Sequence, residues 1–366
     1  MAVIHTLHLH QFRNIEQACL SLSPGLNIVV GDNAAGKTAL IEALWVLASG
    51  RSFRTAKPQQ LIRHGEAGLT LYCEVESDAQ LHKLGLQRQG KQLELRLNGE
   101  SLRSQSELAR YLPIQLLTPE SHRLLEEGPK ARRQFLDWGC FYHHREFMPN
   151  WRAYHRVLKQ RNHALKQRLA APQIQLWDTA LINAGEQISQ YRHAYLNALT
   201  PHLLAFIGEL MPELNAQIDV RFYSGWPSTH SDQQACLNEQ LSRDYQLGHT
   251  QYGPHRADIK FRIQHQEPLV GLSRGQQKLF VCALLLAQAQ FLQQQTNDAV
   301  IMLIDDLPAE LDQHHRSTLL SLLDKLGIQH LVTTTALSLI THKQDETTIF
   351  YLNQGVLTPP LKESDI

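Results

Sequence analysis

The chain of 366 residues carries 35 Lys and Arg against 35 Asp and Glu, so its formal net charge is zero. Hydrophobic residues make up 43% and charged residues 19%, which excludes a disordered or low-complexity protein. No apolar run approaches the roughly 18 residues of a membrane span, and the N-terminus lacks a signal-peptide pattern, so we expect a cytoplasmic protein without a membrane partner.

The charges are unevenly distributed along the chain. Basic residues outnumber acidic ones over residues 1–168, and the reverse holds over 169–366. A basic half is what a polyanionic partner needs, although such asymmetry also occurs without one. The five cysteines are scattered without a C-x-x-C pair, which is typical of a reduced protein.

The first predicted elements lead into a glycine-rich loop. Alternating apolar residues over Val3–Leu9 and Cys19–Leu22 predict two strands, and the β-branched run Leu26–Val30 predicts a buried third one. The next eight residues, 31–38, match G-x-x-x-x-G-K-[ST]. Apolar residues at helical spacing follow, so the motif has the strand–loop–helix context that it requires.

These residue types explain how such a loop holds phosphates. Gly31 and Gly36 allow the backbone to curl so that successive N–H groups and a helix N-terminus face one anion. Lys37 is expected to reach the β- and γ-phosphates, and the Thr38 hydroxyl to ligate Mg²⁺. A chance loop is the alternative, but the flanking strand and helix disfavour it. The predicted nucleotide-binding residues are Gly31, Asp32, Asn33, Ala34, Ala35, Gly36, Lys37 and Thr38.

A basic loop and a small antiparallel sheet come next. The polar stretch Arg51–Arg63 contains no acid, and its Arg51 and Arg54 are candidates for contacts to DNA or to nucleotide phosphate. Strands are expected at Leu69–Glu76, Leu81–Arg88 and Gln92–Leu97, followed by an Asn98-Gly99 turn. Gln115, at the end of the strand-like Ile114–Leu117, is either a glutamine that ligates the metal or an ordinary polar residue.

The pattern changes to long helices between Pro129 and about Met211. The candidates are Ala131–Trp138, Trp151–Leu169 and Trp177–Ile207. We therefore predict an α/β nucleotide-binding domain that is split in sequence, with segments 1–128 and 216–366 on either side of an inserted helical arm, 129–215.

The arm also contains a candidate DNA-binding surface. No acid occurs from Trp151 to Trp177, and three of the basic residues there share one helical face at i, i+4 and i+7. A solvated cationic surface is the alternative. The predicted phosphate contacts are Arg152, Arg156, Lys159 and Arg161, and no pattern for reading bases is visible.

A second chemical motif, Leu272-Ser273-Arg274-Gly275-Gln276, precedes a predicted long amphipathic helix, Gln276–Gln294. Ser273 can cap this helix, whose free N–H groups can hold a γ-phosphate. The motif resembles the L-S-G-G-Q signature loop of ABC-type ATPases, from which Arg274 departs. In that family the loop acts across a dimer, so the resemblance implies that Ser273, Arg274, Gly275 and Gln276 contact ATP held by a second copy of the chain.

The third motif is the buried strand Ala299–Ile304 followed by two carboxylates. In a P-loop ATPase this position holds the Mg²⁺ ligand, which fits Asp305, and Asp306 would then orient or deprotonate the attacking water. An ordinary acidic turn is the alternative. A helix at Gln313–Leu326 and a strand at His330–Thr333 are expected to complete the sheet.

Residues 307–312 are similar to the D-loop of ABC-type ATPases. The position of the switch histidine of transporters is occupied instead by Thr333-Thr334-Thr335. This departure counts against a transporter motor, and it leaves the γ-phosphate sensor unassigned.

Further motifs resemble the RecF family of bacterial DNA repair ATPases, in order along nearly the whole chain. They are Leu7-x-Leu9-x-x-Phe12-Arg13-Asn14, Gly50-Arg51-Ser52-Phe53-Arg54, Pro119-Glu120, Gly128-Pro129-x-x-Arg132-Arg133-x-Phe135-Leu136-Asp137, Gly253-Pro254-His255-Arg256-x-Asp258 and Leu303-Ile-Asp-Asp-x-x-Ala309-Glu310-Leu311-Asp312.

The resemblance implies an ABC-type ATPase head with ATP and Mg²⁺ as cofactors, which closes as a homodimer on DNA at the nucleoid. It also implies a role near single-strand gaps, together with RecR and RecO, in loading the RecA recombinase and supporting the SOS response. Two other readings remain open: the motor subunit of a transporter, and a binding module in which ATP is structural. Asp306 is shorter than the glutamate common in ABC enzymes, so we expect slow ATP hydrolysis.

Overall fold

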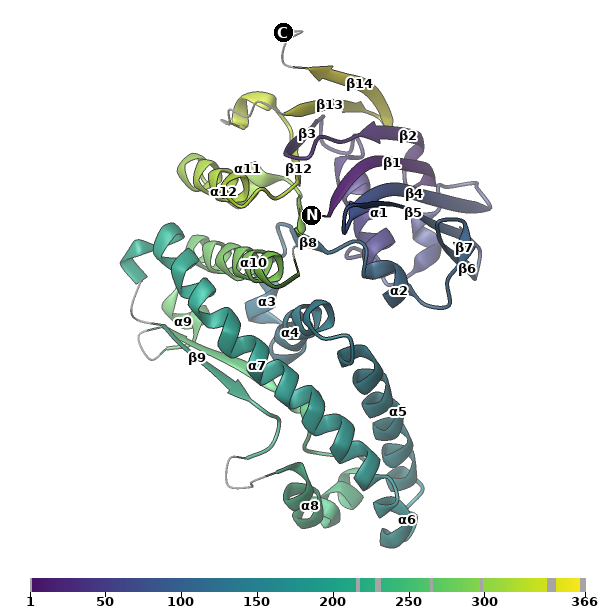
Figure 1. The fold of residues 1–366 in the computed structure, drawn as a ribbon, viewed down its shortest axis with the longest axis vertical. Helices are drawn as coiled ribbons and strands as arrows, with labels where there is room; N and C mark the ends of the chain where they lie inside the picture. The colour runs from purple at the N-terminus through teal and green to yellow at the C-terminus, as the bar shows by residue number, and fades with distance from the viewer. Residues whose placement is uncertain are drawn as a thin grey trace. The chain divides into compact units, whose positions relative to one another are not determined.

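The computed structural model describes residues 2–214, 218–227, 232–263, 266–296, 299–340 and 347–362. The chain divides into two compact units, which we call unit 1 (Met1–Ser121 and Lys278–Ile366) and unit 2 (His122–Gln277). Within the described ranges, every helix is too short or too polar to cross a membrane. Figure 1 shows the course of the chain.

Unit 1 contains a six-stranded antiparallel sheet built from the first hundred residues or so. Its buried and exposed side chains alternate, as with buried Leu7 and Leu9 and exposed His8 and His10. Asn98 and Gly99 have positive φ angles of 52° and 90° and turn the last strands, so the predicted turn and the predicted small sheet are confirmed. In sheet order, the strands are β2 (Ile15–Ser21), β1 (Val3–Phe12), β4 (Gly68–Ser77), β5 (Gln80–Gln89), β6 (Gln92–Leu97) and β7 (Glu100–Ser101).

A second six-stranded sheet in unit 1 joins both ends of the chain. Its first strand pairs antiparallel with the second, and the other described pairs run parallel. All five residues of the strand before the glycine-rich loop are buried, as a strand covered on both faces requires. In sheet order, the strands are β14 (Val356–Lys362), β13 (Thr348–Asn353), β3 (Leu26–Val30), β12 (His330–Thr334), β11 (Ile301–Ile304) and β8 (Ile114–Leu117).

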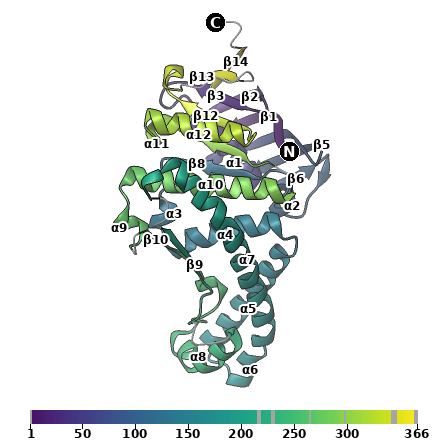
Figure 2. The ribbon, with the colours of Figure 1, turned by 60° about the vertical axis from the view of Figure 1, so that its left-hand side comes forward.

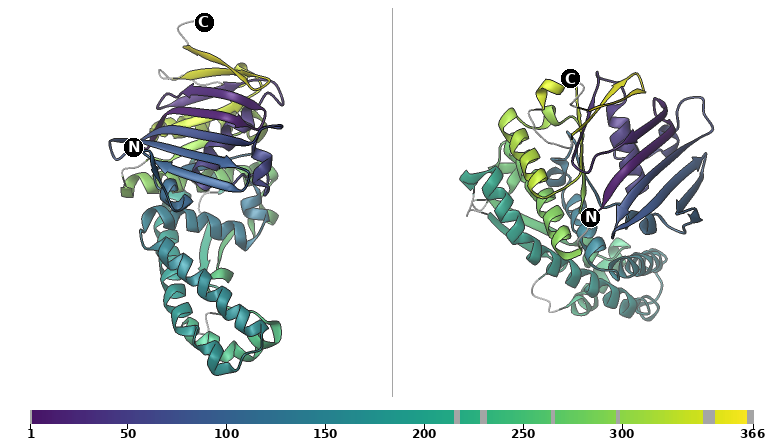
Figure 3. Two further views of the ribbon diagram at one scale, coloured as in Figure 1. Left: turned by 90° about the vertical axis from the view of Figure 1, so that its right-hand side faces the viewer. Right: turned by 45° about the horizontal axis from the view of Figure 1, so that its top comes forward.

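Helix α1 (Lys37–Ser49) fixes the glycine-rich loop between these sheets. Its apolar residues, such as Leu40, Ile41 and Leu44, share one hydrophobic core with strands of both sheets. The helix ends at Gly50, whose φ of 73° places it in the left-handed conformation typical of a C-terminal cap. Figure 3 shows the two sheets from different directions. The remaining helices of this unit are α2 (Gln105–Ala109), α11 (Leu307–Glu310) and α12 (Gln313–Lys325).

Helix α10 (Arg274–Thr296) begins in unit 2 and continues through unit 1. The predicted helix is confirmed, but its predicted amphipathic character is wrong. Residues Leu279 to Ala289 are all buried, because the apolar side chains lie around the whole helix instead of along one stripe.

Unit 2 contains the predicted long helices and additional elements. The helices α5 and α7 pack along each other, and β9 pairs antiparallel with β10 (Figure 2). The expected arm, 129–215, lies within this unit, which continues to Gln277. The elements are α3 (Arg123–Glu126), α4 (Pro129–His143), α5 (Phe147–Lys166), α6 (Ala171–Gln175), α7 (Asp178–Leu210), β9 (Ile218–Tyr223), α8 (Gln233–Leu247), β10 (Asp258–Ile263) and α9 (Pro268–Gly271).

Helix α8 was not predicted from the sequence. Its ends carry recognisable signals, because the Asp232 side chain accepts a hydrogen bond from the Ala235 backbone N–H and Gly248 has a φ of 69°. Only a few of its residues are buried, so the apolar periodicity that reveals most helices is weak here.

Candidate nucleotide-binding site

The predicted phosphate loop connects β3 to α1 with the backbone shape that its glycines permit. Gly36 has a φ of 113°, and a Cβ atom at Gly31 would lie 2.3 Å from the Leu352 carbonyl oxygen of β13. Ala34 also takes a positive φ, of 66°. The loop therefore curls at the N-terminus of α1, where free backbone N–H groups favour an anion.

Two turns between neighbouring strands hold this loop in place. The Asn14 side-chain amide donates to the Ala34 and Ala35 carbonyl oxygens at 3.4 and 3.3 Å, and the Gly355 backbone N–H donates to Ala35 at 2.8 Å. The sequence contained Asn14 in a family motif but offered no reason for its role. It lies in the turn between β1 and β2, so only the fold brings it to the loop.

Lys37 and Thr38 open α1 and lie within the loop's reach. Lys37 is 8% exposed, and its Nζ donates to the Gly31 and Asp32 carbonyl oxygens at 2.6 and 2.9 Å. The Thr38 hydroxyl donates to the Asp305 carboxylate at 2.9 Å. The structure thus brings the predicted lysine, hydroxyl and carboxylate together.

The two carboxylates after β11 differ in environment. Asp305 is 7% exposed, and burial raises the pKa of its carboxyl above the usual value. The hydrogen bonds from the Thr38 and Thr333 hydroxyls lower this pKa, but burial has the larger effect. Asp306 lies at the rim of the cavity with a left-handed backbone, φ 51° and ψ 55°, which is uncommon for a residue other than glycine.

Thr333 of β12 connects these two aspartates. Its hydroxyl donates to Asp305 Oδ1 at 2.8 Å and accepts from the Asp306 backbone N–H at 2.7 Å. From the sequence, this threonine was recognisable only as the replacement of a switch histidine. The pairing of β11 with β12 places it beside the aspartates, which no sequence motif revealed.

A buried carboxylate, Glu42, holds two arginine side chains near the site. Glu42 in α1 is fully buried, and Arg13 binds both of its oxygens, at 2.8 and 2.6 Å. The Ser52 hydroxyl also donates to Glu42, and Arg54 lies 3.7 Å away. The Arg54 side chain is 49% exposed and lines the cavity, which favours the expectation that it contacts nucleotide phosphate.

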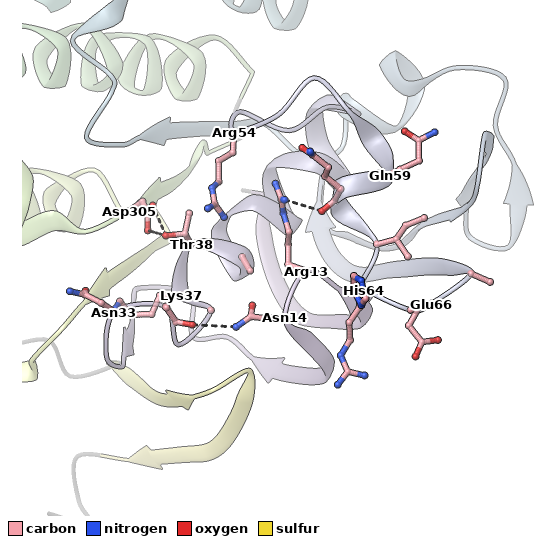
Figure 4. A pocket seen from close by; sticks show the side chains of 18 of the residues that line it. Arg13, Asn14, Asn33, Lys37, Thr38, Arg54, Gln59, His64, Glu66 and Asp305 are labelled. Atoms are coloured by element: carbon pink, nitrogen blue, oxygen red, sulfur yellow. Dashed lines mark hydrogen bonds between the residues drawn. The ribbon is translucent and has the colours of Figure 1, made fainter.

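These residues surround a cavity of about 1130 Å³ in unit 1. Its volume exceeds the range of roughly 300–1,000 Å³ typical of small-molecule sites, so a nucleoside triphosphate fits within it. In Figure 4, Thr38 faces Asp305 and Arg54 extends toward the same space. Lining residues from the loop, α1 and β11 include Asn33, Ala34, Gly36, Lys37, Thr38, Asp305 and Asp306.

The predicted role of Gln115 as a metal ligand is wrong. Gln115 is 3% exposed, its amide donates to Gln288 Oε1 at 3.1 Å, and it is not among the residues that line the cavity. The reason is register: it pairs with Met302, three residues before Asp305. At about 3.3 Å per residue, that is roughly 10 Å below the edge of the sheet where the carboxylates lie.

The oxygens of Thr38 and Asp305 suit a magnesium ion. Both are hard ligands, and Mg²⁺ in phosphate sites is bound by one or two protein groups plus phosphate oxygens and water. Within the described ranges, no cluster of three or more His, Cys, Asp or Glu could hold a metal on its own.

The predicted signature loop lies in unit 2. Ser273, Arg274 and Gly275 are exposed, and a Cβ atom on Gly275 would meet nothing within 4 Å. The Gln276 N–H donates to the Ser273 hydroxyl at 3.3 Å, and the Ser273 N–H donates to the Gln276 side chain at 3.0 Å. This reciprocal cap confirms that Ser273 caps α10, with the start of the helix accessible from outside.

The predicted DNA contacts on α5 divide into two groups. Arg152, Arg156 and Lys159 are exposed, as expected for contacts to a polyanion. Arg161 is 0% exposed, so its assignment to the DNA surface is wrong. It binds Asp178 at 2.8 Å and Asp244 at 2.7 Å, because the helix turns it toward α7 and α8 instead of toward solvent.

Comparisons with known proteins agree with this architecture. The chain matches the family described as "RecF/RecN/SMC N terminal domain" over residues 3–358. It is 57% identical over 340 residues to the DNA replication and repair protein RecF of Hydrogenovibrio crunogenus, and the match covers 93% of this chain and 94% of that protein.

Two solved structures share the fold. One, described as the recombination mediator protein RecF-ATP in the RecFOR pathway, has a TM-score of 0.86 and 25% identity, with 99% of this chain and 98% of that chain covered. The Smc head domain from Pyrococcus furiosus, with 15% identity and a TM-score of 0.61, covers 100% and 97% and shows the same head fold. The predicted ABC-type α/β head is therefore confirmed, and the chain belongs to the RecF family of DNA replication and repair proteins.

Proposed function

We propose that this protein is an ATP-gated recombination mediator that binds DNA near single-strand gaps. The proposal rests on one observation. Lys37, Thr38 and Asp305 line the same cavity, which is large enough for ATP, and Thr38 is hydrogen-bonded to Asp305. A relative of the same fold is described as RecF-ATP, which supports ATP as the ligand.

The residues that line the cavity would have different roles in ATP binding and hydrolysis. Lys37 would exchange its two backbone partners for phosphate oxygens, and Arg54 would add positive charge from the cavity wall. Mg²⁺, when bound by Thr38 and Asp305, would neutralise phosphate charge. Asp306 would orient or deprotonate the attacking water. Its short side chain supports slow turnover, in which ATP acts as a switch.

The signature residues would complete the site from a second copy of the chain. Ser273, Arg274, Gly275 and Gln276 surround an exposed helix start, and such a helix start favours the negative charge of a γ-phosphate. Segments 1–128 and 216–366 would then act together as an ATPase domain, with 129–215 as its inserted arm. Two chains would enclose two ATP molecules, and hydrolysis would release the dimer.

DNA would be held through its backbone by a protein that works at the nucleoid in the cytoplasm. The exposed Arg152, Arg156 and Lys159 supply cations without a base-reading pattern, so binding should depend on salt and not on sequence. The related RecF-ATP structure is described as a mediator of the RecFOR pathway, which supports RecR and RecO as partners. In this pathway the protein would help to load the RecA recombinase and would support SOS induction.

Replacing Asp306 by Asn tests the switch. The variant should bind ATP, dimerise and remain on gapped duplex DNA, because the water would no longer be activated. We would measure ATP hydrolysis and the lifetime of the DNA complex. Asp78→Asn, an exposed aspartate in the β4–β5 turn that also has positive φ, is the matched control. Unchanged DNA lifetime in Asp306→Asn, with hydrolysis abolished, would show that ATP is only structural.

A further inference from the structure

Unit 2 contains a groove that the proposed ATP switch does not use. Its volume is about 870 Å³, and it follows the second half of α5 up to Trp177, before α7. Arg156, Lys159 and Lys166 line it, and no Asp or Glu is among its lining residues in the described part of the chain. The groove is mostly apolar, and every charged residue that lines it is basic. The other lining residues are His155, Leu158, Gln160, Asn162, His163, Ala164 and Leu169.

Two acidic residues that pair with α5 are buried instead of lining the groove. Asp178 follows Trp177 directly, yet it is buried and paired with Arg161 at 2.8 Å. Asp244 of α8 is buried on the same arginine at 2.7 Å. The buried Arg161 thus pairs with two carboxylates inside the unit. The exposed Arg156, Lys159 and Lys166 of α5 remain for an external anion.

Aromatic rings accompany the cations. Trp177 is partly buried and packs on the small core formed by Ala164, Leu165 and Ile174, so its ring is held in place. The His155 ring lies 4.0 Å from the Trp151 ring. Burial lowers the pKa of His155 below its usual value, so this ring is neutral near pH 7 and presents an uncharged aromatic face.

We propose that this groove binds a short single-stranded segment of DNA, with a base stacked on Trp177 and phosphates paired with Arg156, Lys159 and Lys166. The inference rests on the proposed DNA-binding function and specifies where a single strand would lie. Aromatic platforms beside cations are the means by which proteins hold single strands without reading their sequence.

The dimensions favour a single strand over a duplex. Arg156 and Lys166 are ten residues apart on α5, which is roughly 15 Å at about 1.5 Å per residue. That length matches about four stacked nucleotides at roughly 3.4 Å each. A duplex presents its phosphates on a rigid convex surface, whereas unpaired bases can enter a groove that is lined by an indole. A gap in duplex DNA offers both kinds of strand.

Photo-crosslinking locates the strand directly. The protein, with ATP, is bound to a gapped duplex whose single-stranded part carries 5-iodouracil, and the crosslinked peptide is identified by mass spectrometry. We expect crosslinks at Trp177. Crosslinks found only outside the residues that line the groove would overturn the proposal.

Binding of matched variants supplies the second measurement. Trp177→Ala should weaken binding to the gapped duplex roughly tenfold, because a base would lose its stacking partner, and Trp177→Phe should restore most of the affinity. Binding to a fully paired duplex should stay unchanged. Trp226→Ala, a partly buried tryptophan of the same unit that lies outside the groove, is the control and should bind like the wild type.

The outcomes separate this inference from the function on which it rests. If no variant, nor the wild type, binds any DNA with ATP, the proposed function itself fails. If the wild type binds gapped DNA and Trp177→Ala binds it equally well, only the groove assignment fails, and the same acid-free surface becomes a candidate for an acidic protein segment.

Discussion

At the scale of single residues, one hydroxyl connects the two carboxylates of the nucleotide site. Thr333 donates to Asp305 and accepts from the Asp306 backbone, whose left-handed conformation requires support from its surroundings. The positions of both aspartates therefore depend on a residue of a neighbouring strand. We infer that Thr333 is a positioning residue.

Replacing Thr333 by Val keeps the shape of the side chain and removes both hydrogen bonds. ATP hydrolysis should fall roughly tenfold, since one such hydrogen bond is worth about 0.5–1.5 kcal/mol, while ATP affinity changes little. Thr334→Val is the matched control, because the Thr334 hydroxyl donates to the Ala336 carbonyl at 2.9 Å and accepts from the Ala336 backbone N–H at 3.3 Å, away from both aspartates. Single-turnover kinetics and nucleotide titration of both variants measure the difference, and equal rates in the two variants would contradict this role.

The sequence predicts the site residues unevenly, for a physical reason. Lys37, Thr38 and Asp305 were identifiable because each belongs to a local motif with its own strand or helix. Thr333 and Gln115 depend on which strands pair and in which register, information that a single strand does not carry. Arg161 looked like its exposed neighbours because helical periodicity alone could not show that acids of two other helices cover it.

At the scale of elements, the helices of unit 2 are joined by buried polar contacts. Arg161 connects α5 to α7 and α8, and Arg192 of α7 binds both oxygens of Asp137 in α4 at 2.8 and 3.0 Å. Removing one partner of a buried ion pair leaves the other charge in the interior without a counter-charge, which is strongly destabilising.

Arg161→Ala should therefore lower the free energy of unfolding by about 3–5 kcal/mol, because Asp178 and Asp244 would remain buried without a counter-charge. Arg156→Ala, five residues earlier on the exposed side of α5, should change stability by less than about 0.5 kcal/mol. It should instead weaken DNA binding and reduce its salt dependence. Urea unfolding and DNA titrations distinguish the two arginines, and similar stabilities would refute the assignment.

His255 makes the stability of unit 2 sensitive to acid. Its Nε2–H donates to the Thr250 carbonyl at 3.1 Å, its Nδ1 accepts from the Tyr154 hydroxyl at 2.6 Å, and burial lowers its pKa to about 4. The unfolded chain binds a proton near pH 6.5 and the folded chain only near pH 4, so stability is full above pH 6.5 and falls as the pH drops toward 4.

From pH 7.5 to 5.0 this histidine alone should cost about 2 kcal/mol of unfolding free energy. The variant His255→Gln, although less stable overall, should lose correspondingly less over the same pH interval. Chemical denaturation of both proteins at the two pH values tests this. An identical pH dependence would show that another group is responsible.

The elements themselves were largely predictable, because most have strong periodicity or capping signals. The strands of the antiparallel sheet and the helices α5 and α7 were located within a few residues. Helix α8 was missed because its apolar stripe is short. The burial of α10 on all sides was also missed, since a segment's sequence does not show how many neighbours will cover it.

At the scale of the whole molecule, the proposed ATP site takes its phosphate loop from one copy of the chain and its signature loop from a second copy. The phosphate loop lies in unit 1 and the signature loop in unit 2, where Arg274 is exposed at the start of α10. We predict that two copies of the chain associate only when ATP is bound.

Arg274→Glu should leave ATP affinity of the single chain nearly unchanged and abolish ATP-induced dimerisation, since a negative charge would face the partner's γ-phosphate. Light scattering with chromatography, with and without ATP, measures the change in mass. Lys91→Glu, a charge reversal at an exposed turn between β5 and β6, is the control and should dimerise normally. Dimerisation of the Arg274 variant would exclude the signature loop from the contact.

The most direct test of ATP-gated DNA binding is fluorescence anisotropy on gapped duplex DNA, without nucleotide, with ADP and with ATP, each at two salt concentrations. We predict tight binding only with ATP, weakened by salt and lost in Lys37→Met, which removes the phosphate-binding amine. Affinity that is the same in all three nucleotide states would contradict an ATP gate.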